Sequence, residues 1–75
     1  MSTDRIAILN AVWDKECGAN AKHWSLAGIK RGVVYVRPKS AAAAQELHMK
    51  AEGLIGALNK YFSRAWILAV RATYR

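Results

Sequence analysis

Residues able to perform covalent or metal chemistry are scarce in this sequence of 75 residues. A single cysteine, Cys17, excludes an internal disulfide. Cys17, His23 and His48 are the only soft metal ligands in the sequence. Their positions lack the paired spacing of a zinc site. The five acidic residues form no paired motif, and no Ser-His-Asp pattern is present. We therefore expect a protein without metal, cofactor or enzymatic activity.

Long apolar runs are absent as well. No stretch approaches the roughly 20 apolar residues of a membrane-spanning helix. The opening segment, MSTDRIAILN, has an acid early and lacks the long apolar core of a signal peptide. We expect a cytoplasmic protein that does not contact a membrane.

Acidic side chains are few relative to basic ones. Twelve Lys and Arg against five Asp and Glu give a net charge of +7. This surplus favours a polyanionic partner such as DNA, RNA or an acidic protein, and the simpler alternative is a basic surface that aids solubility. A hydrophobic content of 53% is too high for a disordered chain. The length predicts a single domain, residues 1–75, with a modest core.

The apolar pattern near the N-terminus predicts a helix. A residue of the Ser2–Asp4 segment can cap its start, and Gly18 is suited to end it. Apolar residues recur at the spacings of one helix face, namely Ile6, Leu9, Trp13 and Cys17. We expect Trp13 to be a core anchor and Cys17 to be a buried, inert thiol rather than a nucleophile.

The segment Ala21–Ser40 is rich in strand-forming residues and lacks a helical period, which predicts a β-hairpin. Its turn is Lys30–Gly32, where the glycine can adopt a positive φ. In the second strand, Val34 and Val36 should face the core. The alternation places the other residues on the opposite face: Val33, Tyr35 and Arg37.

Ser40 is placed to cap a second helix that extends to about Phe62. An apolar stripe predicts its buried face: Ala44, Leu47, Ala51, Leu54, Ile55, Leu58 and Phe62. Gly53 and Gly56 interrupt the pattern, and we expect them to allow close contact with the sheet or to mark a kink. Their GLIG spacing matches the GxxG of RNA-binding KH loops in letters only, because its centre is apolar, so we interpret it as helix interior.

The closing segment, AWILAVRATYR, alternates as a third strand. Its two faces would carry Trp66, Leu68, Val70 and Ala72 on one side, and Ile67, Ala69, Arg71 and Thr73 on the other. Both amphipathic helices need a shared sheet face. We therefore predict a two-layer α+β fold of order α-β-β-α-β, with a three-stranded sheet and both helices on one face.

An ordered set of segments runs through nearly the whole chain: VWDKECG, IKRGVVYVRPKSAAAAQEL, LIGALNKYF and the closing strand. It resembles the DciA family of bacterial replicative-helicase loaders. That family has a helix ending in Trp and a later Gly, a hairpin with a basic residue and Gly at its turn, a Ser-led helix, a Leu-Asn pair and a final strand. The matching residues here are Trp13 and Gly18, Arg31 and Gly32, Val34 and Val36, Ser40, Gln45 to Leu47, and Leu58 with Asn59.

The resemblance implies a KH-like fold with an α-β-β-α-β core. It also implies a role in bacterial DNA replication, through contact with the replicative helicase and with DNA. The family usually has an aromatic residue where this chain has Ala43. Two other functions fit the residues themselves: a protein-only adaptor with a basic surface, and an RNA-binding KH-like domain.

Basic residues at the hairpin turn, the strand ends and the exit of the second helix are candidate nucleic-acid contacts, because phosphate binding needs positive charge without strict geometry. They are Lys30, Arg31, Arg37, Lys39, Lys60, Arg64 and Arg71, with Arg75 at the end. We expect DNA binding to be independent of base sequence. Trp24, Tyr35 and Trp66 are candidates for base stacking, and we expect two of the three to lie in the core and Tyr35 to be exposed.

The sheet face opposite the helices has no predicted cover. Val33 and Ile67 should lie on it, among apolar and cationic neighbours. Exposed apolar area of this kind usually marks a partner surface, so we expect docking of the helicase there, or of a second copy of the chain as a homodimer.

Overall fold

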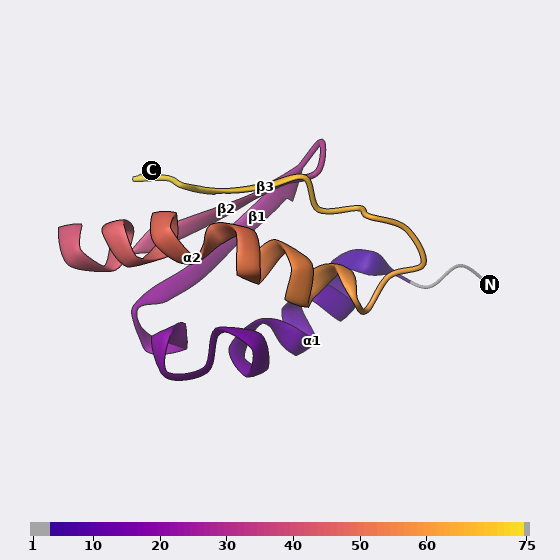
Figure 1. The fold of residues 1–75 in the computed structure, drawn as a ribbon, viewed down its shortest axis with the longest axis horizontal. Helices are drawn as coiled ribbons and strands as arrows, with labels where there is room; N and C mark the ends of the chain where they lie inside the picture. Colours follow the sequence, from indigo (N-terminus) through magenta and orange to yellow (C-terminus); the bar gives the residue numbers. More distant parts are fainter. Residues whose placement is uncertain (1–3, 75) are drawn as a thin grey trace.

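The computed structural model describes residues 4–74, and Figure 1 shows both helices on the same side of a three-stranded sheet. The elements are α1 (Arg5–Cys17), the short 3-10 helix η1 (Gly18–Lys22), β1 (Trp24–Lys30), β2 (Val33–Pro38), α2 (Ala41–Asn59) and β3 (Ala69–Ala72). The predicted order α-β-β-α-β and the two-layer arrangement are confirmed. The 3-10 turn after α1 was not predicted, and it moves the start of the first strand to Trp24.

Helix α1 begins and ends at the residues that its sequence indicated. The Asp4 carboxylate accepts a hydrogen bond from the Ile6 N–H at 3.0 Å and caps the first turn. The other two candidate caps, Ser2 and Thr3, lie outside the described residues. Gly18 ends the helix with a φ of 60°, a conformation that costs glycine little, and its N–H donates to the Asp14 carbonyl. Ile6 was expected on the buried face but is 53% exposed, because the contact with the core begins one turn later.

The hairpin turn consists of Arg31 and Gly32, which have φ values of 53° and 81°. Positive φ at both central residues is typical of the two-residue turns that match the twist of paired strands. The register pairs Lys30 with Val33, and β3 then lies beside β2 in a parallel ladder, giving the strand order β1-β2-β3. The turn is also packed: a Cβ added at Gly32 would lie 3.0 Å from the Trp66 carbonyl oxygen.

The central strand β2 separates the two faces of the sheet. Val34 and Val36 are fully buried beneath the helices. They belong to one cluster that also contains residues of both helices, including Leu9, Leu47 and Leu58. The opposite face has no cover from the described residues.

The C-terminal part of α2 differs from the expectation at its glycines. The GLIG segment is helix interior, as predicted. Gly53 and Gly56 are nevertheless exposed, and a Cβ at either position would have no atom within 4 Å. The expectation that they allow close contact with the sheet is therefore wrong.

The third strand is shorter than predicted, and this changes the position of Ile67. Strand β3 comprises only Ala69–Ala72, and Ile67 precedes it as a core residue that is 1% exposed. The expectation that Ile67 lies on the open face is wrong, and it is not available there as a partner contact. The cause is Asn59, whose amide accepts from the Ile67 N–H and donates to the Ile67 carbonyl, both at 2.9 Å. This side chain replaces a neighbouring strand, so the alternation of β3 does not extend back to Ile67.

Two buried tryptophans connect the helices to the sheet. The indole N–H of Trp13 on α1 donates to the Trp24 carbonyl at 3.1 Å, and the indole N–H of Trp24 on β1 donates to the Ala43 carbonyl on α2 at 2.8 Å. Both side chains are at most 3% exposed. Trp13 is thus the core anchor that the sequence predicted, whereas Trp24 is too deeply buried to stack on bases.

We predict that Trp13→Ala lowers the free energy of unfolding by ~3–5 kcal/mol, because it leaves a cavity between α1 and the sheet. This is a large part of the stability of a small domain. Trp13→Phe keeps a ring but leaves the Trp24 carbonyl without its indole donor, so its cost should be smaller, about 1–3 kcal/mol. Urea unfolding followed by circular dichroism measures both. An alanine variant as stable as the wild type would contradict the anchor role.

A matched pair of glycine substitutions tests the hairpin turn. Gly32→Ala should destabilise the fold by about 1–3 kcal/mol, because alanine is strained at this φ and its Cβ meets the Trp66 carbonyl. Gly53→Ala, at an exposed helical position, should instead stabilise it by up to about 1 kcal/mol. The same unfolding titration compares the two. Equal effects of the two substitutions would contradict the packed turn.

Candidate nucleic-acid interface

The acidic residues are confined to the two helical ranges, whereas most of the basic residues lie elsewhere. Every acidic residue falls in residues 4–17 or 41–59, which form the two helices with the α1 cap. These two ranges hold five acids and three cations, Arg5, Lys15 and Lys50, a net charge of 3 − 5 = −2. The rest of the sequence holds the other 12 − 3 = 9 cations and no acid. The sheet, its hairpin turn and the connection from α2 to β3 therefore contain basic residues and no acidic ones.

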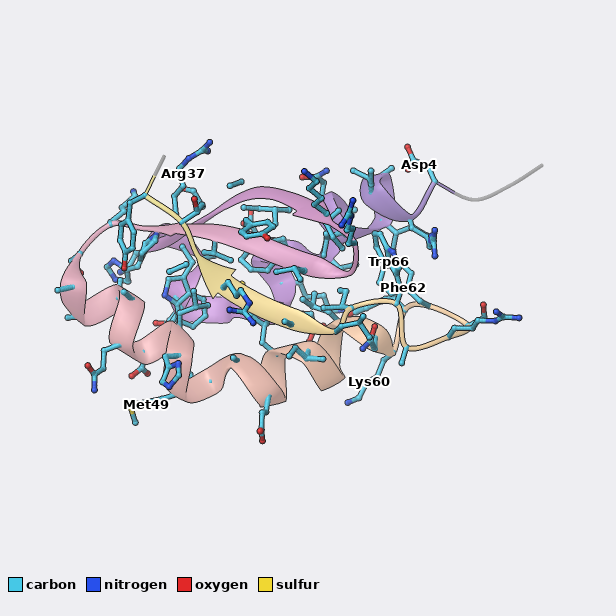
Figure 2. All side chains as sticks on the ribbon, turned by 90° about the horizontal axis from the view of Figure 1, so that it is seen from above. Asp4, Arg37, Met49, Lys60, Phe62 and Trp66 are labelled. Atoms are coloured by element: carbon cyan, nitrogen blue, oxygen red, sulfur yellow. The ribbon has the colours of Figure 1, made fainter. Side chains whose placement is uncertain are left out.

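The open sheet face brings together several of the predicted contacts. The register places Tyr35 on β2 beside Arg71 on β3 and opposite Gly28 on β1. The face, hereafter the open face, comprises Ser25, Gly28, Lys30, Val33, Tyr35, Arg37, Ala69 and Arg71. Lys30, Arg37 and Arg71 are exposed. In Figure 2, Arg37 extends from one side of the molecule and Met49 of α2 from the other.

Tyr35 lies on the open face as predicted, but it is partly rather than fully exposed. It lies on the central strand of the sheet, which is paired on both sides. Val33 is also partly buried on this face. Its proposed contact with a partner or a second copy stays a prediction.

The remaining predicted cations lie away from the open face. Lys39 is exposed just after β2, where its N–H donates to the His23 carbonyl at 3.0 Å. Arg31 is at the hairpin turn. Lys60 caps the end of α2, and Arg64 lies in the connection to β3, and both are exposed. Arg75 lies outside the described residues.

One cation near this connection was missed by the sequence reasoning. The guanidinium of Arg5 lies 4.7 Å from the centre of the Trp66 ring, and Phe62 meets the same ring edge-on at 4.9 Å. Figure 2 shows Phe62 and Trp66 together beside the start of α1. No spacing rule links Arg5 to Trp66, because they are at opposite ends of the chain.

Cys17 has the environment of a structural thiol. Burial raises its pKa to about 12, and the nearby charges of Asp14 and Glu16 add to the effect. The thiolate, which is the nucleophile, is therefore almost absent near neutral pH. Glu16 also accepts a hydrogen bond from the Tyr61 hydroxyl, which raises the pKa of Tyr61 and connects α1 to the end of α2.

Two features are absent from the described part of the chain, a cluster of metal-binding side chains and a membrane-spanning helix. Residues 4–74 contain no group of three His, Cys, Asp or Glu side chains able to hold a metal ion. Neither described helix is long and apolar enough to cross a membrane.

Comparison with known proteins identifies the family. The family model described as "Dna[CI] antecedent, DciA" matches residues 4–71. This chain belongs to the DciA family. The DciA family is linked to helicase loading in DNA replication and implies interaction with a replicative helicase. No curated protein and no solved structure matches the chain.

Most residues that carried the DciA resemblance have structural roles in this DciA protein. Trp13 anchors α1, Gly18 ends it, and the Ser40 hydroxyl caps α2 by accepting from the Ala43 N–H at 3.0 Å. Asn59 holds Ile67 in the core. The individually matched residues therefore mainly specify the fold, and Arg31 is the one candidate phosphate contact among them.

The Cys17 pKa predicts a specific pH dependence of stability. Above about pH 9 the thiol of the unfolded chain ionises, whereas the folded thiol stays protonated until about pH 12. The raised pKa therefore contributes stability at lower pH that is lost as the pH rises across this range. Cys17→Ala should lose less stability than the wild type between pH 8 and 10.5, as measured by urea unfolding. Identical pH profiles would contradict the shifted pKa.

Proposed function

We propose that this DciA-family protein is a two-sided adaptor of bacterial DNA replication, which holds DNA on its open face and the replicative helicase on its helical side. The observation that carries the proposal is the separation of charge. Nine cations and no acid lie outside the two helical ranges, whereas those ranges are net negative. The part of the molecule without acids attracts phosphate more strongly than the net negative helices do, so DNA bound there leaves α2 accessible to a protein partner.

The open face is suited to phosphate rather than to base-edge recognition. Its exposed cations, Lys30, Arg37 and Arg71, are separated across three strands on a sheet surface. Within residues 4–74, no helix projects from this side to enter a groove. Backbone contacts of this type carry no sequence information. We therefore expect DNA binding that is independent of sequence and strongly dependent on salt.

The helical side is suited to a protein. Met49 on α2 is 70% exposed and is followed by the exposed Glu52 and Gly53. A flexible methionine is common on surfaces that bind other proteins. The Glu46–Lys50 ion pair on the same helix is solvent-exposed at 2.8 Å and contributes little to stability. We propose that the helicase contacts this surface, that the protein works in the bacterial cytoplasm, and that it acts without catalysis of its own.

Matched charge reversals test the DNA-binding side. Lys30→Glu combined with Arg71→Glu should weaken binding to single-stranded and duplex DNA, because it replaces two cations that face phosphate with anions. The slope of log K against log salt should become shallower by about 0.7–0.9 for each phosphate that is no longer neutralised. The control is Lys15→Glu combined with Lys50→Glu, which changes net charge equally on the helical side. Fluorescence anisotropy at several salt concentrations measures the affinities of both variants and the wild type.

The control shows whether DNA affinity depends on the cations of the open face or only on the net charge of the protein. Equal weakening of DNA binding in the two double variants would contradict the open face as the contact surface. Wild-type protein that binds no DNA at low salt would instead favour the protein-only adaptor, and tighter binding to RNA of equal length would favour an RNA-binding domain.

The helicase contact is tested with the same proteins. Met49→Lys combined with Glu52→Lys should abolish retention of the replicative helicase in a pull-down and leave DNA affinity unreduced, because the added charges are positive. The open-face variant should retain the helicase. The opposite pattern would place the helicase on the sheet and contradict the two-sided arrangement.

A further inference from the structure

A pocket lies between the first turn of α1 and the connection from α2 to β3. Its volume is about 400 Å³, within the range of sites that hold small molecules. The side chains that define its chemistry are Arg5, Phe62, Arg64 and Trp66, with the hydroxyl residues Tyr61 and Ser63 also on its wall. Among the described residues, no acidic side chain lines it.

The aromatic part of the pocket is held in place by the fold. Trp66 packs against the core, and its ring meets Phe62 at an interplanar angle of 73°. The connection itself is folded tightly, with the Trp66 N–H donating to the Arg64 carbonyl at 2.8 Å. Asn59 fixes the next residue, Ile67, through two hydrogen bonds. The Trp66 ring is therefore positioned before any ligand arrives.

The cationic part of the pocket is not neutralised by the protein. The Arg5 guanidinium covers the Trp66 ring at 4.7 Å, and this contact leaves its N–H edges able to donate. Within residues 4–74, neither Arg5 nor Arg64 forms an ion pair. A ligand that satisfies this pocket therefore combines a planar ring with an anionic group.

The surroundings of the pocket favour a nucleotide over an acidic or phosphorylated peptide. The hairpin turn packs against this connection, where Gly32 lies close to the Leu68 side chain and the Trp66 carbonyl. The Gly32 carbonyl also accepts a hydrogen bond from the Leu68 N–H at 2.7 Å. That turn carries Arg31, which directly follows Lys30 of the open face. The turn and the connection both contain cations and no acid, which suits a polyanionic strand.

We infer that this pocket binds one unpaired nucleotide of a nucleic-acid strand, with its base stacked on the Arg5–Trp66 pair and its phosphate on Arg64. The inference rests on the nucleic-acid binding proposed above and adds a specific consequence. A base inside a duplex cannot reach the pocket, whereas a base in a single strand can stack on aromatic rings and guanidinium planes. The protein should therefore bind a strand with accessible bases more tightly than a sugar-phosphate backbone without bases.

The test compares the affinity for a 12-nucleotide single-stranded DNA with that for an oligonucleotide of the same length and charge in which every nucleotide lacks its base. Wild-type protein should bind the normal strand at least roughly fivefold more tightly, because each stacked base adds affinity. Trp66→Leu and the exposed pair Arg5→Gln with Arg64→Gln should reduce this ratio to near one. Tyr35→Leu, on the open face, should leave the ratio above that of the pocket variants.

A second measurement uses intrinsic fluorescence, which does not depend on the oligonucleotides. Titration with dAMP should quench the emission of Trp66 in the wild type, and inorganic phosphate at equal concentration should not. Arg5→Gln with Arg64→Gln should abolish the quenching while circular dichroism shows an unchanged fold. This double variant keeps the test decisive if Trp66→Leu unfolds, because both arginines are exposed.

The outcomes separate the pocket from the proposed function. The pocket is overturned if the wild type binds normal and abasic strands with equal affinity. The proposed DNA-binding role of the open face still holds in that case if binding depends on salt and the open-face variant has lost it. Absence of binding to either strand at low salt overturns the proposed function. Stronger quenching by a phosphotyrosine peptide than by dAMP overturns the nucleotide assignment and identifies a peptide site.

Discussion

Two indole hydrogen bonds hold the two layers of this protein together. Trp13 joins α1 to β1, and Trp24 joins β1 to α2 at Ala43. Each indole supplies a large apolar surface and a single donor, and both donors are satisfied inside the core. No buried polar side-chain atom among residues 4–74 lacks a partner. Because the helices are fixed to one face by these contacts, the other face is free to be basic.

The Trp24 bond also explains a departure from the family pattern. The DciA resemblance leads one to expect an aromatic residue at position 43, where this chain has alanine. The Trp24 indole reaches the backbone at that position from the neighbouring strand. The small side chain of Ala43 is compatible with that approach, so β1 supplies the aromatic group at this point on α2.

Much of the fold was predictable because its signals are local. Asp4, Gly18 and Ser40 delimit helices through their own backbone and side-chain chemistry, and the valines of β2 alternate along one strand. The position of Ile67 was not predictable from alternation, since its partner is a side chain eight residues earlier rather than a strand. The same limit applies to the candidate site: composition revealed the cations, but only the tertiary structure brings Arg5 to Trp66.

The separation of charge has a further consequence at the distances over which ions act. The two shorter dimensions of the molecule are 22 and 19 Å, whereas electrostatic interactions in water decay over about 8 Å at physiological ionic strength. The helical acids are therefore largely screened from a polyanion lying against the sheet. An approaching strand experiences the local field of the basic layer, not the average field of a molecule with charge +7. In dilute buffer the decay length grows to about 30 Å, and the two layers then act as a dipole that turns the protein sheet-first before contact.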